Sequence, residues 1–342
     1  MTYQLMYKDD VVIEFDPKSI ESYDCVNEKL LPIGIQNGMN LESWLRQRRA
    51  DKSRVSVRKL FATLKMNFGQ DGYISQFRKP TDFWWIRKKG SDDVFDVPIE
   101  DLHLITLNLE AIVPKSPRTF EVANIGSYEK GWKENHLIKF GKVNELFSEL
   151  LYANISTGYM PTAQYGVEKI KGHLFISSLN FIDQSVGEYL VLADEWTGTG
   201  SEEGFEGWFD QFKGQLSEAE VSALSIMHFL DVVMNNFDRH CQNFGFVYDE
   251  AGERRLAPNF DFNLSIIGYN SLKQLGENEM PLSTYFELFD DIPLAVKHVP
   301  DIKKLEQEII KICHLLALDG HNYLPVAQWI VTRWKTLIGG IF

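Results

Sequence analysis

Three features are scarce in this 342-residue sequence, and each absence narrows its class. Cysteine is nearly missing: Cys25, Cys241 and Cys313 lie far apart, which indicates a reducing compartment with neither a disulfide framework nor a CxxC metal pair. No apolar run approaches the roughly 18 residues that a membrane span needs, since even 226–234 is interrupted by His228 and Asp231. The start of the sequence has no apolar signal core. We therefore expect a cytoplasmic protein without a membrane partner; an effector delivered to another cell is the alternative.

Positive charge is the third scarce feature, with 35 Lys and Arg against 48 Asp and Glu and a formal net charge of −13. This balance argues against direct nucleic-acid binding, which depends on Lys and Arg clustered on phosphates. Residues 41–90, which include Arg46 and Arg48, are the exception: they carry 13 Lys and Arg and 4 Asp and Glu, so their balance is +9 and the rest of the chain sums to −22. This basic stretch is either a solvated helical face with a hairpin end, or a docking face for an acidic partner, nucleic acid or the acidic remainder of the chain.

Local patterns divide the chain into three parts. Residues 1–113 are expected to form an accessory region, and the prolines at 114–117 mark a linker after it. Residues 118–193 and 194–342 are expected to form two lobes of one fold. Within the accessory region we expect a strand at 10–15, helices at 41–49 and 55–66, and an aromatic strand at 83–86 that is buried rather than a ligand platform.

The second part has the element order of a kinase N-lobe. It is expected to contain strands at 119–124, 136–140, 166–170 and 173–177, a glycine-bounded loop at 125–131, a helix at 144–155 and a connection at 188–193. In a kinase N-lobe the loop covers the phosphates, and a strand Lys, here Lys139, pairs with a helix Glu. Glu149 is our expected partner, and Glu145 is the alternative one turn earlier. The loop is not a Walker A loop, because Trp132 follows Gly131 and the loop lies between strands.

A long helix precedes the most informative string of the third part. Ser217 and Glu220 fit a capping box, and Met227, Leu230 and Met234 recur at the spacing of a core-facing stripe. We therefore predict a helix that runs up to about residue 234 and delivers the chain directly into the next loop. Two more helices, at 301–318 and 324–337, are expected to form the core of this lobe.

The loop after this helix reads D-R-H-x-x-N, from Asp238 to Asn243, and a second carboxylate, Asp261, follows 23 residues after the first. Strands at 244–248 and 255–260 bracket a turn at 249–252, so their pairing brings Asn243 and Asp261 to the open end of one hairpin. Phosphoryl transfer needs such a set: one carboxylate to orient the attacking hydroxyl, and an amide oxygen and a second carboxylate to hold Mg²⁺. The alternative is that 238–240 form only a structural turn.

These motifs resemble those of the HipA-like kinases, most closely the smaller CtkA-like branch. Members carry a D-R-H-x-x-N-F-G-F string, an A-P-x-F-D string, a G-S-Y-E-K type loop and an I-K-F strand, which here stand at 238–246, 257–261, 126–130 and 138–140. The resemblance covers residues 118–340 and is weaker over 1–110. Phosphoinositide kinases share a D-R-H-x-x-N string, so they are the natural rival.

The resemblance implies an α+β, two-lobed protein-kinase-like fold with an N-terminal accessory region. It implies an ATP- and Mg²⁺-dependent serine/threonine protein kinase, acting as a toxin or effector on a cellular protein, and a separately encoded antitoxin-like partner. By residue, it implies that Asp238 accepts the proton of the attacking hydroxyl, that His240 shapes the catalytic loop, and that Asn243 and Asp261 bind Mg²⁺. It further implies that Gly126, Ser127 and Lys130 belong to the phosphate-covering loop, and that Lys139, paired with Glu149, contacts the phosphates.

Other functions stay open, and two positions depart from the family pattern. A catalytically weak kinase-fold regulatory module with 41–90 as its docking face, a lipid or small-molecule kinase, and a nucleotidyl transferase all fit the same site. Asn263 stands where a D-F-G string has glycine, which is expected to limit backbone freedom after Asp261. Residues 123–125 contain no serine, so regulation by a phosphorylated serine before the loop, as in HipA-type toxins, is not expected.

Overall fold

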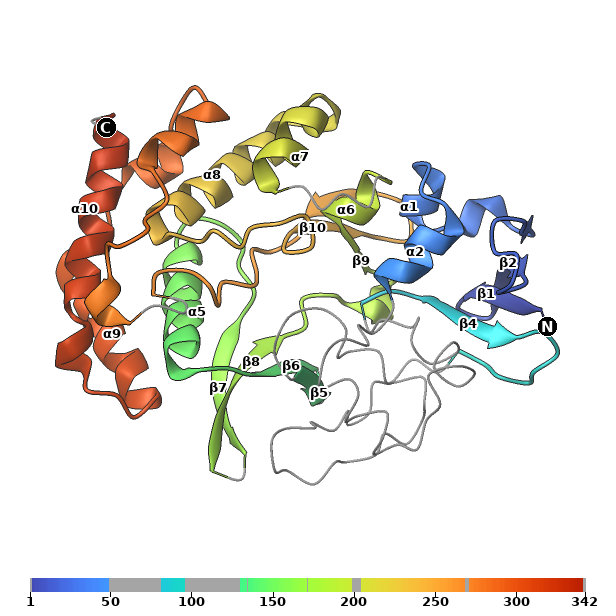
Figure 1. Cartoon of the computed structure of the whole chain (residues 1–342), viewed down its shortest axis with the longest axis horizontal. Helices are drawn as coiled ribbons and strands as arrows, with labels where there is room; N and C mark the ends of the chain where they lie inside the picture. Colours follow the sequence, from blue (N-terminus) through green and yellow to red (C-terminus); the bar gives the residue numbers. More distant parts are fainter. Residues whose placement is uncertain are drawn as a thin grey trace. The chain divides into compact units, whose positions relative to one another are not determined.

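A computed structural model describes residues 2–48, 81–95, 130–133, 135–170, 172–198, 204–267 and 271–340 (Figure 1). The chain divides into two compact units. Unit 1 comprises Met1–Phe140, Leu179–Ser201 and Phe246–Arg254; unit 2 comprises Gly141–Ser178, Glu202–Gly245 and Arg255–Phe342. Each unit contains helices and antiparallel strands, which confirms the predicted α+β class.

A four-stranded antiparallel sheet forms the centre of unit 1. Its order is β3 (Asp24–Cys25), β2 (Asp10–Phe15), β1 (Tyr3–Tyr7) and β4 (Trp84–Lys88). The strands predicted at 10–15 and 83–86 are therefore present. The aromatic strand is buried, with Trp84 and Trp85 only 4% and 1% exposed, so it serves the core as expected.

The basic stretch departs from its simple interpretation as a solvated helical face. The helix α2 (Leu41–Gln47) begins at Asn40, whose side chain accepts a hydrogen bond from the Ser43 amide at 2.8 Å. Arg48, directly after α2, is 1% exposed and its two terminal nitrogens donate to both Asp82 oxygens at 2.6 and 2.8 Å. Only a carboxylate that matches the guanidinium fork can compensate such burial. Arg46 does face solvent; residues 49–80 lie outside the described part of the chain.

The remaining described elements of unit 1 include a hairpin and a strand–helix step. β5 (Lys130–Lys133) pairs with β6 (His136–Phe140), with Lys130 opposite Lys139, so Lys130 stands in a strand rather than in the predicted loop. The residues of the predicted connection at 188–193 form the strand β9 (Tyr189–Leu192) and the start of the short helix α6 (Ala193–Trp196). Their role as a connection between lobes stays a prediction. The predicted strand at 119–124, the helix at 55–66 and the linker at 114–117 lie outside the described residues.

Unit 2 contains most of the long helices. They are α5 (Val143–Ser156), α7 (Phe205–Phe212), α8 (Glu218–Met234), α9 (Ile302–Leu315) and α10 (Pro325–Gly339). An antiparallel hairpin of β7 (Tyr165–Ile170) and β8 (His173–Leu179) follows α5 in the chain. Phe229 of α8 meets Trp334 of α10 edge to face, with ring centroids 5.1 Å apart. The buried Arg333 of α10 donates to the carbonyls of Val232 and Val233 at 2.6 and 3.0 Å. A cation thus satisfies the last turn of α8, where the helix dipole is negative.

The hairpin after the D-R-H-x-x-N loop is shorter than predicted. Its strands are β10 (Gly245–Tyr248) and β11 (Arg254–Leu256), and the Ala257 amide donates to the Gly245 carbonyl at 2.8 Å at the open end. The strand predicted to reach residue 260 stops because Pro258 has no N–H to continue the ladder. Asn259 instead forms a parallel bridge with Thr162.

Candidate active site

The D-R-H-x-x-N loop begins where α8 ends. Ser217 caps the start of α8: its amide donates to Glu220 at 2.8 Å, and its hydroxyl accepts from the Glu220 amide at 3.2 Å, which confirms the predicted capping box. At the other end Asn235 adopts a left-handed conformation with φ 58°, one that Asn tolerates better than most residues. Its side-chain oxygen accepts from the Met280 amide at 2.6 Å. The helix therefore ends at this residue, and the loop from Asn236 to Asn243 begins directly after it.

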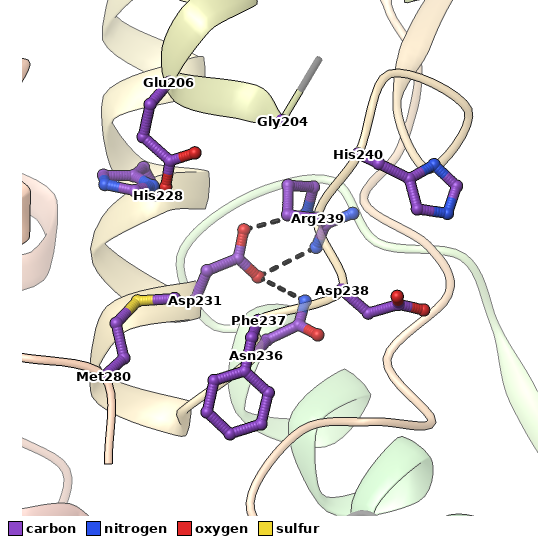
Figure 2. A pocket seen from close by; sticks show the side chains of 10 residues that line it. All are labelled: Gly204, Glu206, His228, Asp231, Asn236, Phe237, Asp238, Arg239, His240 and Met280. Carbon is purple, nitrogen blue, oxygen red and sulfur yellow. Dashed lines mark hydrogen bonds and ion pairs between the residues drawn. The ribbon is translucent and has the colours of Figure 1, made fainter. Parts of the chain in front are cut away.

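A buried ion pair between Asp231 of α8 and Arg239 of the loop is the centre of the site (Figure 2). Arg239 Nε donates to one carboxylate oxygen at 2.8 Å, and Arg239 Nη2 donates to the other at 2.9 Å. Tyr152 Oη and Asn236 Nδ2 both donate to that second oxygen at 2.7 Å. Asp231 therefore accepts four hydrogen bonds with 1% of its surface exposed. This saturation is what makes a buried charge tolerable.

The other donors of Arg239 hold the two ends of the predicted metal site. Arg239 Nη1 donates to the carbonyls of Asn243 at 2.6 Å and Phe260 at 3.0 Å, and Nη2 also donates to the Asn259 side chain at 3.0 Å. One guanidinium thus ties α8, the loop and the segment before Asp261 together. The structure in this way brings Asn243 and Asp261 into one neighbourhood, as the hairpin argument predicts.

Asp261 has a left-handed backbone conformation with φ 63°, which is uncommon for a residue other than glycine. Its amide donates to Tyr165 Oη at 3.0 Å. The next residue, Phe262, is fully buried and its ring lies parallel to that of Tyr152, with centroids 4.2 Å apart. Asn263 is not among the described residues with positive φ, so this conformation does not require a glycine there. The expected limit on backbone freedom after Asp261 stays a prediction.

Asp238 is half-buried and its carboxylate is electrostatically perturbed. Burial raises the pKa of Asp238, the negative charge of Asp261 raises it further, and His240 and Arg239 act in the opposite direction. Burial and a neighbouring negative charge both favour the protonated form, so Asp238 holds a proton more readily than an ordinary aspartate.

Asn243 supplies the third group of the set. It is 3% exposed, and its side-chain nitrogen donates to the Asp238 carbonyl at 2.7 Å. Because only the nitrogen end of the amide can donate, this bond assigns the oxygen end as the acceptor. Across the described residues no group of three or more His, Cys, Asp and Glu side chains could hold a metal. Asn243 and Asp261 instead offer an amide oxygen and one carboxylate, which are hard oxygen ligands of the kind that Mg²⁺ accepts.

His240 holds the shape of the loop. The Gln242 amide donates to its Nδ1 at 3.2 Å, and the His240 amide donates to the Asp238 carbonyl at 3.0 Å. An Nδ1 that accepts a hydrogen bond leaves the ring proton on Nε2. These contacts are consistent with the role that the resemblance implies for His240, which is to shape the loop.

Two solved structures are similar to this one. HipA of Shewanella oneidensis MR-1, in a toxin–antitoxin structure with HipB and operator DNA, is 13% identical, with 98% of this chain and 96% of that chain covered and a TM-score of 0.50. The Helicobacter pylori proinflammatory kinase CtkA is 15% identical, with 62% and 90% covered and a TM-score of 0.46. No protein-family model and no curated protein sequence matches the chain. The chain has the fold of the HipA-like kinases.

This HipA-like fold confirms the fold that the motifs implied. The match to the Shewanella structure covers 98% of this chain. Among the described residues no helix is long and apolar enough to cross a membrane.

The nucleotide-contacting residues expected of a HipA-like kinase are only partly described. Lys139 stands on β6 with 9% of its surface exposed, and Glu149 stands on α5 with 2% exposed. Glu145, the alternative partner, accepts from the Lys142 amide at 3.0 Å at the start of α5. Lys139 belongs to unit 1 and Glu149 to unit 2, so their pairing stays a prediction. Gly126, Ser127 and the side chain of Lys130 lie outside the described residues.

Four side chains that hold this candidate site together are not predicted from the sequence: Asp231, Arg239, Tyr152 and Tyr165. A signal for the first was present, because Asp231 interrupts the apolar stretch 226–234 of a core-facing helix, and a buried carboxylate requires a cationic partner. Arg239, eight residues later in the D-R-H string, is that partner. Nothing in the spacing of Tyr152 or Tyr165 points to their hydroxyl contacts.

Proposed function

We propose that this chain is an ATP- and Mg²⁺-dependent kinase that phosphorylates serine or threonine residues of a protein. The observation that supports it best is that Arg239 Nη1 donates both to the Asn243 carbonyl at 2.6 Å and to the Phe260 carbonyl at 3.0 Å. Asp238 precedes Arg239 in the loop and Asp261 follows Phe260, so one guanidinium holds the backbone beside all three groups. Two carboxylates and an amide oxygen are the groups that phosphoryl transfer with Mg²⁺ requires.

The chemistry divides among residues of known position. Bound Mg·ATP supplies the phosphoryl group and the charge that neutralises it. Asp238 positions the acceptor hydroxyl and takes its proton, and its raised pKa makes it a stronger base than an ordinary aspartate. Asn243 and Asp261 would hold the magnesium ion. Arg239 keeps the carbonyls on both sides of that set in place.

The phosphate-binding part of the proposal rests on the resemblance. Lys139 would contact the phosphates with Glu149 as its ion-pair partner, and the loop with Gly126, Ser127 and Lys130 would cover them. A cytoplasmic toxin or effector role and a separately encoded antitoxin-like partner belong to the same proposal, since the similar Shewanella HipA occurs in a structure with HipB.

Incubation of the full chain with labelled ATP, Mg²⁺ and total soluble protein, followed by intact-mass analysis, tests this function. The proposal expects one or more added phosphoryl groups on protein and their loss in Asp238→Asn. An added AMP would indicate a nucleotidyl transferase, and label found only in lipids or small molecules would indicate the rival kinases. Absence of Mg²⁺-dependent ATP binding would leave a regulatory module. Full protein phosphorylation by Asp238→Asn would contradict the mechanism.

A further inference from the structure

A pocket of about 140 Å³ lies beside the catalytic carboxylate in unit 2. Figure 2 shows its lining, which comes from the start of α7, from α8, from the catalytic loop and from Met280. Asp238 and His240 belong to the same lining. Whatever enters this pocket therefore lies next to the group that would receive the acceptor's proton.

Two buried polar atoms in the pocket lining lack a partner within the protein. They are His228 Nε2 and Asn236 Oδ1, and across the described residues they are the two buried side-chain polar atoms without a hydrogen bond. Both side chains are 1% exposed. Buried polar groups in native structures are almost always satisfied, so an unsatisfied pair that lines one cavity points to a ligand.

Both unpartnered atoms are hydrogen-bond acceptors. The Asn236 nitrogen donates to Asp231 at 2.7 Å, which identifies the free end of the amide as oxygen. The backbone of Thr284 raises the pKa of His228, as a hydrogen-bond acceptor beside the ring does, and the Thr284 amide is already used by the Pro281 carbonyl at 3.2 Å. Burial, the largest influence, lowers the pKa of His228 and so favours the neutral ring. A neutral ring that donates from Nδ1 presents Nε2 as an acceptor. The pocket therefore calls for hydrogen-bond donors.

The charge of the lining points the same way. Glu206, Asp231 and Asp238 contribute three carboxylates against the single cation of Arg239, whose nitrogens already donate to Asp231, to Asn259 and to two backbone carbonyls. Glu206, at the start of α7, is exposed to solvent, and within the described part of the chain it forms no ion pair. The negative balance disfavours an anionic ligand and favours a cationic one.

An apolar rim completes the pocket. Phe237, at the beginning of the catalytic loop, is 53% exposed, which is unusual for a phenylalanine beside so many polar groups. Met280 lines the pocket as well. Lysine and arginine side chains combine an apolar stem with a donor-only cationic head, and aromatic faces attract such cations.

We propose that this pocket binds a lysine or arginine side chain of the acceptor protein, close in sequence to the serine or threonine that Asp238 positions. The head would donate to His228 Nε2 and pair with Glu206, which lies beside His228 in Figure 2, and the stem would lie along Phe237 and Met280. This inference rests on the proposed function and adds a substrate class to it: polypeptides with a basic residue near the phosphorylated hydroxyl.

The test is binding of a peptide library to the full chain, without ATP. Each peptide contains one fixed serine, and one flanking position carries arginine, lysine, norleucine or glutamate in turn; fluorescence polarisation gives the dissociation constants. At one or two positions, the arginine or lysine peptides should bind about tenfold more tightly than the norleucine peptides, and glutamate peptides should bind most weakly. Equal affinity of basic and norleucine peptides at every position would overturn the inference.

A matched pair of variants locates the effect. Glu206→Gln removes only the charge of an exposed side chain and should reduce the preference for basic peptides at least about threefold. Glu218→Gln changes another exposed helix-start glutamate, outside the pocket, and should leave the preference unchanged. Phosphorylation of the same library separates the two proposals. Transfer without basic preference would refute the pocket alone, whereas basic preference in binding without any transfer would refute the kinase alone.

Discussion

Removal of the Asp231 carboxylate is the perturbation from which the structure predicts the largest effect. Asp231→Ala leaves four donors without their acceptor: Arg239 Nε and Nη2, Tyr152 Oη and Asn236 Nδ2, at present 2.7 to 2.9 Å away. Two of the four donors belong to the guanidinium of Arg239, a permanent cation that is buried. Removing one partner of such a pair costs about 3–5 kcal/mol of unfolding free energy.

The predicted loss is large relative to the whole. A domain is stable by only about 5–15 kcal/mol, so Asp231→Ala should remain partly folded but unfold at a much lower urea concentration. Urea unfolding followed by circular dichroism and tryptophan fluorescence measures the change. Phosphate transfer should disappear together with it, because Arg239 no longer holds the carbonyls of Asn243 and Phe260 in place.

Two further variants make this prediction refutable. Asp210→Asn removes the partner of Lys213 in an exposed pair at 3.0 Å, and should cost less than about 1 kcal/mol. The double variant Asp231→Leu with Arg239→Met removes both buried charges and should be more stable than Asp231→Ala, because no uncompensated ion remains. If Asp231→Ala costs no more than Asp210→Asn, the buried pair does not organise this site.

Three other outcomes follow from particular contacts. Arg48→Ala should cost about 3–5 kcal/mol in urea unfolding because it strands Asp82, whereas Arg46→Ala, on the exposed pair with Glu42, should cost under about 1 kcal/mol; similar costs would refute the distinction. Burial lowers the pKa of His228, so below the ordinary histidine pKa the unfolded chain binds more protons than the folded one. The free energy of unfolding therefore falls as the pH falls through this range, by up to about 1.4 kcal/mol per pH unit. His228→Gln should remove that part of the acid-side slope, and an unchanged slope would show that His228 does not titrate this way. Ser217→Ala should cost about 1 kcal/mol by loss of the α8 cap, while Ser222→Ala, on the exposed face of the same helix, should not destabilise; equal effects would contradict the capping role.

Local patterns predicted those elements whose cause is local. The start of α8 follows from Ser217 and Glu220, and the length of α5 follows from its apolar spacing. The hairpin after the catalytic loop was predicted too long because its second strand was extended through Pro258, which cannot donate to a ladder. After Pro258, Asn259 forms a parallel bridge with Thr162, and no local sequence pattern predicts this long-range contact.

The site was predictable as a list of residues but not as an arrangement. The string from Asp238 to Asn243, together with Asp261, indicates phosphoryl transfer. The side chains that hold these residues in place are Arg239 and Asp231, and in the sequence they are visible only as part of the D-R-H string and as an interruption in an apolar run. Their pairing depends on how the loop folds back onto α8. Arg48 shows the same limit of local patterns. Its basic neighbourhood predicts a solvated side chain, but its partner Asp82 lies 34 residues away in the sequence and pairs with it in the core.

The most direct test of the central claim compares single-turnover phosphate transfer by the wild-type chain, Asp238→Asn and Asp210→Asn, with urea unfolding of all three in the same buffer. We expect Asp238→Asn to keep its folded stability but to transfer phosphate about 10²–10⁴-fold more slowly, which is the usual contribution of a general base. Asp210→Asn should transfer phosphate at the wild-type rate. A folded Asp238→Asn chain that transfers phosphate as fast as the wild type would contradict the role of Asp238 as the base.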